Sequence, residues 1–404
     1  MRIALLTHEP FHPPSGGGSA AAVYLVRQLV ARGHEVEVFG PALPDAPDVE
    51  ARFHIRLRPF TAWPMGRTTP LRTPKYLAYP VALSRQIARL LASGLHFDVV
   101  VAQHAISAVA AGRLGRRFQI PTVFNLLDCL TGFLETWPAC LMPRPLARAL
   151  VRYELHLPVR FQASRVLTVS DSLRERLIAT GYPADRVRAT YYGYDSTLFR
   201  VPAQPCPSPP EPRVVMHGSF DRHHLGPIAR TAVIETARAR PHVPFRFVGP
   251  ATPSLNAFLR TVRAAVPGIL IEQPGFVPYD RMPSSLLDAT VGITPYEPST
   301  GTHCAFVAKT VEYLALGLPV VCTPLESALR YYKGLDGIRF SRANGPDFAR
   351  LLIDTLDWSS TRRAAAVAPA RHKVATELDW NIICRRAADW IEGAALPAHS
   401  PQVP

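Results

Sequence analysis

Lys309 and Glu312 place a cation and a carboxylate in the run AKTVEYLALG, which follows the polar stretch EPSTGT. The two residues are three positions apart, so on a helix they share one face. A strand-like run, VGIT, precedes the polar stretch, and a second one, PVVCT, follows the helix. In such a strand–loop–helix–strand unit, ligands bind where the loop meets the helix N-terminus. The pair therefore marks a candidate ligand site, and a solvated ion pair is the alternative interpretation.

Gly16, Gly17 and Gly18 form a second candidate site between a proline-rich turn and a helical run. Glycines allow backbone N–H groups to approach a phosphate at the start of a helix, where the helix dipole also favours an anion. The spacing is not that of the G-x-G-x-x-G fingerprint, so a flexible turn is the alternative.

Polar residues also follow three buried apolar runs, which are 97–104, 121–129 and the run that ends at Gly218. His104 ends the run 97–104, and Asp128 lies near the end of the run 121–129. Chemistry in α/β proteins concentrates at the carboxyl ends of parallel strands, although a structural hydrogen bond is the alternative for each residue. After Gly218 comes a cluster of three bases, Arg222, His223 and His224, for which a solvated loop is the alternative.

The elements that position these residues alternate between short buried strands and amphipathic helices. RIALLT, a glycine loop, a helix and EVEVFG open the chain, and similar units recur to about residue 358. This order predicts an α/β fold with parallel sheets. The stretch 201–212, VPAQPCPSPPEP, excludes a helix or a central strand and predicts a linker. The predicted divisions are 1–200, the linker 201–212, 213–375, a helical end at 376–395 and a disordered tail at 396–404.

Composition limits the partners. A chain of 404 residues has room for two or three domains, and its net charge of +14 suits nucleic acid, nucleotide phosphates or an anionic membrane surface. No basic eight-residue run or zinc pattern is present, which argues against nucleic acid. Six cysteines without a C-x-x-C pair, and no signal peptide or spanning segment, predict a cytoplasmic protein.

The first domain carries a basic run from Arg52 to Lys75, beside a predicted helix with Arg85 and Arg89. Such a surface can rest on anionic lipid, which predicts peripheral attachment at the inner face of the cytoplasmic membrane. A solvated basic face and a site for an acidic acceptor are the alternatives.

The stretch 291–323 resembles the donor-binding signature of retaining, nucleotide-sugar-dependent glycosyltransferases of family four. In that family a Pro-Tyr strand end and a polar loop precede K-x-x-E-Y-L-A-x-G-x-P-V-V. The run 165–199 is similar to another family segment, with Gly193, Asp195 and Phe199 at matching places. The resemblance extends over about residues 1–395.

The resemblance implies the GT-B fold, in which two Rossmann-like domains face each other across a cleft. Residues 1–200 would form the acceptor domain and 213–375 the donor-nucleotide domain, with the helix at 376–395 returning to the first. The implied enzyme moves a sugar from a nucleoside diphosphate sugar to a glycan, lipid or small-molecule acceptor, with retention at the anomeric carbon. It would use no metal and no cofactor. No Asp-x-Asp and no metal-ligand cluster near the donor loop is evident in the sequence.

The resemblance also assigns roles to residues. Glu312 would accept hydrogen bonds from ribose hydroxyls, Lys309 would lie near the phosphates, and the loop 299–302 would meet the sugar or phosphate with its N–H groups. The implied catalytic residues are His104, Asp128 and Arg222. The implied donor-binding residues are Gly16, Gly17, Gly18, Gly218, Arg222, His223, Thr300, Gly301, Thr302, Lys309 and Glu312.

The sequence departs from the family pattern at several of these places. Leu127 and Ser219 replace a histidine and an arginine, and Cys304 replaces a glutamate eight positions before Glu312. Glu297, on the same loop, is a candidate to compensate for the glutamate. The departures keep two alternatives open: a catalytically inactive nucleotide- or glycan-binding protein of the same fold, and a sugar-nucleotide epimerase.

Overall fold

The computed structural model describes residues 1–14, 17–60, 72–200 and 212–395, except for the side chains of 72–76. The chain divides into two compact units. The first contains residues 1–130, 149–191 and those from 381 on, and the second contains residues 131–148 and 192–380.

The sheet of the first unit has seven parallel strands in the order β3-β2-β1-β4-β5-β6-β7. They are β1 (Arg2–Leu6), β2 (Glu35–Pro41), β3 (Arg56–Phe60), β4 (Val99–Gln103), β5 (Thr122–Leu126), β6 (Arg165–Thr168) and β7 (Val187–Ala189). Every residue of β4 and β5 is buried. Helices cover both faces of such a sheet, which is why its central strands are nearly continuous apolar runs.

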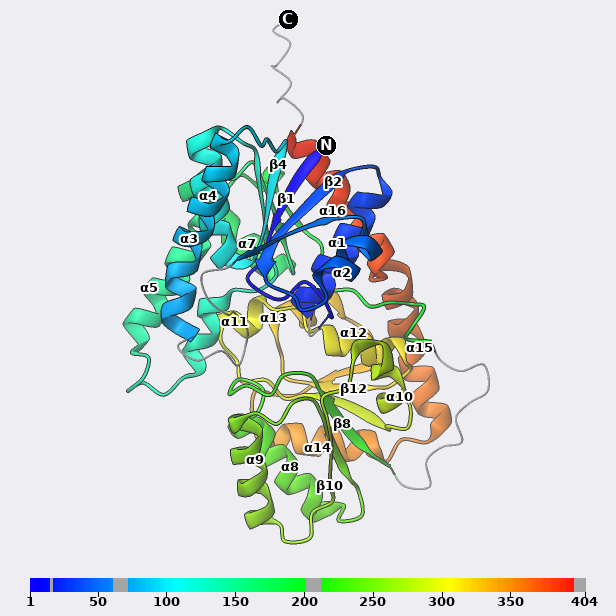
Figure 1. The fold of residues 1–404 in the computed structure, drawn as a ribbon. Coiled ribbons are helices and arrows are strands. Elements are labelled where there is room, and N and C mark those ends of the chain that lie inside the picture. The colour runs from blue at the N-terminus through cyan, green and yellow to red at the C-terminus, as the bar shows by residue number, and fades with distance from the viewer. Residues whose placement is uncertain (15–16, 61–71, 201–211, 396–404) are drawn as a thin grey trace, which may run out of the picture. The chain divides into compact units, whose positions relative to one another are not determined.

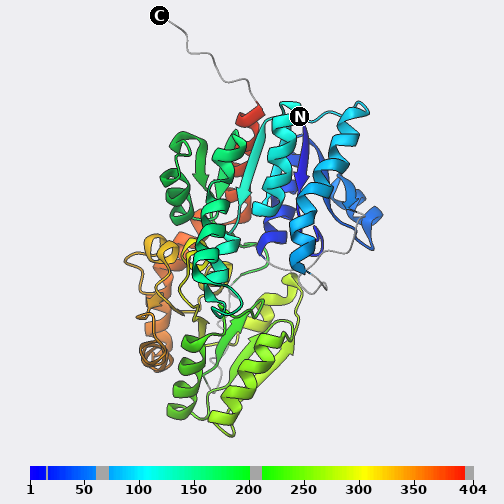
Figure 2. The same ribbon diagram turned by 90° about the vertical axis from the view of Figure 1, so that its left-hand side faces the viewer.

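The helices of the first unit connect these strands. They are α1 (Gly17–Ala31), α2 (Ala46–Phe53), α3 (Arg72–Ala92), α4 (His104–Phe118), α6 (Leu157–Phe161), α7 (Asp171–Ala179) and the turn η2 (Ala184–Arg186). Helix α5 (Arg144–Leu155) begins in the second unit and ends in the first. Helices α3 and α4 pack side by side (Figure 2).

The last helix, α16 (Trp380–Ala395), belongs almost entirely to the first unit. The guanidinium of Arg32, directly after α1, donates hydrogen bonds to Asp389 (2.7 Å) and Glu392 (2.9 Å). The Trp390 indole N–H donates to the Val166 carbonyl on β6 (3.2 Å). These contacts attach α16 to Arg32 and to β6.

The sheet of the second unit has six parallel strands in the order β10-β9-β8-β11-β12-β13 (Figure 1). They are β8 (Val214–His217), β9 (Phe245–Val248), β10 (Ile271–Gly275), β11 (Val291–Thr294), β12 (Val320–Cys322) and β13 (Ile338–Phe340).

Helices α9 (Pro253–Ala265), α14 (Gly345–Leu356) and α15 (Ser360–Glu377) of the second unit each start at a side chain that bonds a free N–H group. Thr252, Asn344 and Ser359 accept the N–H of the third residue after them. The helices are η1 (Leu130–Thr136), α8 (Pro227–Ala239), α9 (Pro253–Ala265), η3 (Tyr279–Arg281), α10 (Met282–Leu286), α11 (Thr300–Cys304), α12 (Ala308–Ala315), α13 (Glu326–Tyr331), α14 (Gly345–Leu356) and α15 (Ser360–Glu377).

The predicted α/β fold is confirmed. The predicted divisions differ from the two units, since residues 131–148 and 192–200 were placed in the first domain, and 376–380 in the helix that returns to it, but all belong to the second unit. The predicted linker (except Pro212) and the predicted tail lie outside the described residues. Within the described ranges, no helix has both the length and the hydropathy needed to cross a bilayer.

Candidate functional site

The second sheet has a switch point between β8 and β11. From β8 the chain continues to β9 and β10 on one side, and it then returns to β11, β12 and β13 on the other. In an open parallel sheet, ligands bind at such a point, outside the carboxyl ends of the strands. The loops that follow β8 and β11 are joined there by a hydrogen bond from the Glu297 N–H to the His223 carbonyl (2.9 Å).

The Glu312 carboxylate lies buried at this edge, with 6% of the residue exposed. Its Oε2 is 2.5 Å from Nε2 of His217, the last residue of β8. Nδ1 of the same ring is 2.9 Å from the Tyr313 hydroxyl, which also accepts the backbone N–H of His217 (3.1 Å). Because Glu312 is buried and bonded to His217, the solvated ion pair with Lys309 does not describe it.

The His217 ring bridges Glu312 and Tyr313. Its Nε2 faces the Glu312 carboxylate and its Nδ1 faces the Tyr313 hydroxyl, which donates to the Val215 carbonyl (3.4 Å). Burial raises the pKa of the Tyr313 hydroxyl, which keeps that donor protonated. A carboxylate has about four acceptor positions, so the bond to His217 leaves others for the hydroxyl groups of a ligand.

Lys309 lies on the same face of α12 as Glu312. Its ammonium group donates to the Tyr296 hydroxyl (2.8 Å) and is 5.4 Å from the centroid of that ring. Its side chain passes over Gly218, where a Cβ would be 2.5 Å from Cε and 2.9 Å from Nζ of the lysine. The φ of Gly218 is +104°, so both the backbone conformation and the close approach require glycine.

The loop after β8 brings the three predicted bases to the same place. Arg222 is exposed, His223 is half-buried and His224 is buried. His224 packs on Tyr296, with ring centroids 4.5 Å apart, and His223 stacks on Phe133 at the same separation. The tyrosine that holds the ammonium group of α12 therefore also contacts the basic loop.

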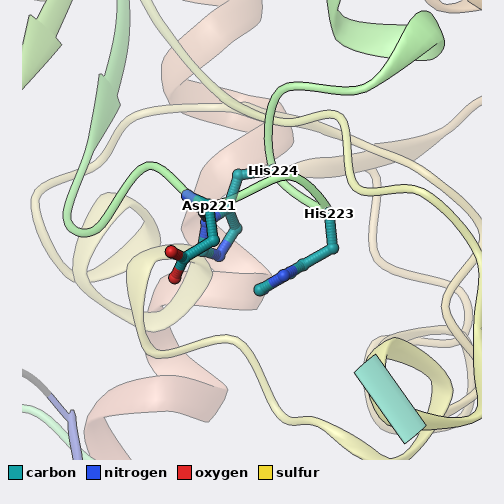
Figure 3. Close-up of side chains that lie close together, drawn as sticks. All are labelled: Asp221, His223 and His224. Atoms are coloured by element: carbon teal, nitrogen blue, oxygen red, sulfur yellow. Dashed lines mark hydrogen bonds between the residues drawn. The ribbon is translucent and has the colours of Figure 1, made fainter. Parts of the chain in front are cut away.

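Asp221, His223 and His224 form a cluster on the loop after β8 that the sequence did not predict (Figure 3). One ligand-type atom of each lies within 4.8 Å of the others, and two histidines with a carboxylate are a zinc-type ligand set. However, the Asp221 N–H donates to Nδ1 of His224 (3.0 Å). That bond uses the lone pair of Nδ1 and leaves the ring proton on Nε2. A metal ion would bind His224 only after this hydrogen bond is lost.

The predicted polar loop 299–302 contains the start of the short helix α11. Ser299 Oγ accepts the Thr302 N–H (3.1 Å), and Thr302 Oγ1 accepts the Ser299 N–H (2.8 Å), which forms a capping box. Thr302 is fully buried. Its hydroxyl therefore serves the start of the helix.

A carboxylate from η1 meets the same helix start. Glu135 accepts hydrogen bonds from the Thr300 N–H (2.7 Å) and the Thr300 hydroxyl (3.0 Å). Beside it the two backbones touch, since a Cβ on Gly132 would be 2.3 Å from the Gly301 nitrogen. The Thr300 N–H, predicted to meet the donor, is thus already bonded to a carboxylate.

The Glu297 carboxylate makes a structural hydrogen bond. Its Oε1 accepts the Ile228 N–H (2.7 Å) at the start of α8, and its side chain fills the space beside Gly226. Burial raises the pKa of this carboxyl, and the hydrogen bond from Ile228 opposes that rise. Cys304 is fully buried. The proposal that Glu297 compensates for a missing carboxylate at Cys304 therefore finds no support.

The first unit has its own switch point, between β1 and β4. His104 begins α4 directly after β4, is buried and has a left-handed φ of +63°. Its Nε2 is 3.9 Å from Oε2 of Glu9, and the Gln103 amide donates to the Gly18 carbonyl (2.6 Å). Gly18 and His104 are therefore brought together, and Glu9 joins them.

The remaining predicted residues of the first unit lie around this edge. Gly17 is the first residue of α1, and Gly16 lies outside the described residues. Asp128 is half-buried just after β5, the neighbour of β4 in the sheet. Asp128 is thus one strand away from the switch point.

Sequence reasoning missed His217, Tyr296, Glu135 and Glu9. His217 carried a usable signal, because it is a polar residue at the end of a buried strand, RVVMH. Tyr296 likewise follows the strand VGIT. Glu135 had no local signal, because its partner Thr300 is distant in the chain.

The fold and the two switch points define a GT-B type architecture, and comparisons with known proteins agree with it. Residues 15–198 match the sequence profile described as Glycosyltransferase Family 4. This match covers most of the first unit and leaves out the Lys309–Glu312 region. No curated protein sequence matches the chain.

Solved structures resemble the chain over nearly its whole length. HepE from Anabaena, in complex with UDP and glucose, is 17% identical, with a TM-score of 0.73, 97% of this chain covered and 99% of that one. Sucrose-phosphate synthase from Thermosynechococcus elongatus is 16% identical, with a TM-score of 0.78 and coverage of 97% and 98%. WaaG, a glycosyltransferase involved in lipopolysaccharide biosynthesis, is 15% identical, with a TM-score of 0.69 and coverage of 97% and 100%. At these identities the likeness shows the fold.

Proposed function

We propose that the protein transfers a sugar from a nucleoside diphosphate sugar to a hydroxyl group of a glycan, lipid or small-molecule acceptor, with retention at the anomeric carbon. One observation carries the proposal: a buried carboxylate, Glu312, oriented by His217, shares a helix face with Lys309 at the switch point of the second sheet. A nucleoside diphosphate needs both groups, an acceptor for ribose hydroxyls and a cation for phosphate oxygens.

In this proposal Glu312 accepts hydrogen bonds from the ribose, while Lys309 and Arg222 neutralise the diphosphate. Charge builds up on the diphosphate as its bond to the sugar breaks, so fixed cations there stabilise the transition state. No metal takes part, because these side chains supply the positive charge. The acceptor lies on the first unit, near His104 and Asp128.

UDP is the first nucleotide to test, because the similar HepE structure contains UDP and glucose. Calorimetry with UDP, GDP and ADP measures binding, and mass spectrometry with the matching sugar nucleotides detects transfer or donor hydrolysis. The anomeric configuration of a transferred sugar is then read by NMR. Failure to bind any nucleoside diphosphate would overturn the proposal.

Two other results would favour the alternatives. Tight nucleotide binding without any turnover would indicate an inactive binding protein of this fold. Conversion of the donor sugar with the diphosphate bond intact would indicate an epimerase.

A further inference from the structure

Helix α5 exposes large apolar side chains on its outer face. Leu146 is 49% exposed and Tyr153 is 45% exposed, and Ala149 between them is also exposed. These three positions follow helical spacing, so they form one stripe along the helix. The opposite face, with Ala147, Val151 and Glu154 buried, packs against the protein. Helix α5 therefore carries apolar side chains on both faces, and only one face is covered by the described residues.

The same outer face is positively charged. Arg144, Arg148 and Arg152 are all exposed on α5. The single carboxylate of the helix, Glu154, is buried and accepts the Leu130 N–H (2.8 Å). No other Asp or Glu occurs from residue 136 to residue 170. Apart from the buried Glu154, the sequence therefore offers these arginines no acidic residue on their own helix or elsewhere in 136–170.

The adjoining segments continue this composition. Trp137 and Leu141 are exposed before α5, and Val159 and Arg160 are exposed on α6 after it. The Arg160 guanidinium is 5.5 Å from the Tyr153 ring centroid. Half of the large hydrophobic side chains exposed among the described residues fall between 137 and 159. Such a concentration marks an interaction surface.

We propose that this α5 surface (the outer face of α5 together with Val159 and Arg160) binds a membrane rich in anionic lipids. An interfacial helix buries an apolar stripe at headgroup depth while flanking arginines meet lipid phosphates, and α5 carries both features. A nucleic acid would engage the arginines but would leave Leu146 without a partner. An acidic protein is the occupant that the test must exclude.

This surface is distinct from the one predicted from the run Arg52–Lys75. In that run Arg58 donates to the buried Glu37 carboxylate (2.8 Å), so it is used by the fold. Residues 61–71 lie outside the described residues. The proposal does not depend on sugar transfer.

Co-sedimentation with vesicles tests the proposal, using phosphatidylcholine with and without phosphatidylglycerol. The wild-type protein should bind only the anionic vesicles. The double variant Arg148→Glu/Arg152→Glu should bind at least about tenfold less, since each basic group near an anionic surface contributes to binding. The pair Leu146→Ser/Tyr153→Ser should lose the part of binding that persists in high salt.

Arg260→Glu/Arg263→Glu is the matched control, because these arginines are exposed on α9 and the change in net charge is the same. The control should bind like the wild type, and all variants should keep their melting temperature and nucleotide affinity. If the control variant lost as much vesicle binding as the α5 variant, the loss would be explained by net charge alone, and the proposal would be overturned. Equal binding to neutral vesicles, or binding by the α5 variant at the wild-type level, would also overturn it. If the wild-type protein binds no vesicles, the proposal is also overturned. This holds even if sedimentation velocity shows that the α5 surface mediates self-association.

Discussion

The Glu312 carboxylate lies 2.5 Å from Nε2 of His217, and this contact joins helix α12 to the end of strand β8. The strand at the switch point thus sets the position of the carboxylate that the helix presents. The His217 ring is held in turn by the Tyr313 hydroxyl. The proposed ribose contact is therefore positioned before any ligand arrives.

Replacing Glu312 by Ala should weaken binding of UDP by ~1.5–3 kcal/mol, the scale of a charge-assisted hydrogen bond. Glu312→Gln keeps an acceptor for His217 and removes the charge, so it should melt like the wild type and lose part of the affinity. Titration calorimetry measures both. Asp336→Asn, at an exposed position of the same unit, is the control. An unchanged affinity in Glu312→Ala would rule out the ribose contact.

Gly218→Ala should reduce both stability and nucleotide affinity. A side chain at φ +104° is strained, at a cost of about 1–2 kcal/mol, and its Cβ would displace the end of Lys309. Gly268→Ala is the matched control, because its φ is +89° and nothing lies within 4 Å of its added Cβ. Chemical denaturation should show a similar loss in both variants, and calorimetry should show weaker UDP binding only in Gly218→Ala. Equal UDP affinities in the two variants would indicate that Lys309 does not contact the nucleotide.

Glu135→Ala should strengthen UDP binding ~2–10-fold, because the Thr300 N–H and hydroxyl then no longer face a competing carboxylate. Glu135→Gln retains an acceptor without the charge and should give an intermediate affinity. Both follow from the same calorimetric titration. Weaker binding in these variants would mean that Glu135 itself contacts the ligand.

Sugar transfer should survive exhaustive treatment with EDTA, because Lys309 and Arg222 are proposed to neutralise the leaving diphosphate. The Asp221–His223–His224 cluster is the candidate metal site that could contradict this prediction. Loss of activity that zinc, magnesium or manganese restores in the wild type, but not in His223→Ala, would show that the cluster holds a functional metal.

Stability should depend on pH through Glu37 of β2. Burial alone would raise the pKa of this carboxyl, but hydrogen bonds from Arg58 and Arg2 outweigh it, and the pKa lies below the ordinary 4.5. A carboxyl with a lowered pKa contributes stability above its unfolded pKa, and that stability is lost as the pH falls through the folded pKa.

Glu37→Gln should therefore destabilise the protein by about 1–3 kcal/mol at neutral pH. The difference from the wild type should shrink as the pH falls below 4.5. Urea denaturation at several pH values measures it. Glu35→Gln is the control, because Glu35 is 79% exposed and its contact with Arg2 is 3.8 Å long. If the difference in free energy of unfolding between the wild type and Glu37→Gln stayed constant across the pH range, Glu37 would not be the source of the pH dependence.

The fold was largely predictable because its signals are local. Buried runs such as VVVAQ become strands, and capping residues such as Ser170 mark helix starts. The neighbourhood of Lys309 and Glu312 on α12 was also predictable, since helical spacing alone puts them on one face.

The partners of these residues were not predictable in the same way. Whether Glu312 faces solvent or a buried histidine depends on the register of α12 against β8, which involves residues far apart in the chain. The use of Glu297 at the start of α8 depends on a similar long-range contact with Ile228. Spacing within a motif carries no information about such contacts.

The close approach of Gly132 to Gly301 bears on how this chain can be recombined with its structural relatives. Residues 131–148 are encoded in the first half of the chain but complete the second unit. A chimera that borrows only the segment after the predicted linker would pair α11 with a foreign η1. It would lose the Glu135 contact, and any side chain at position 132 would collide with the helix. A chimera keeps these contacts of the second unit only when it also includes residues 131–148.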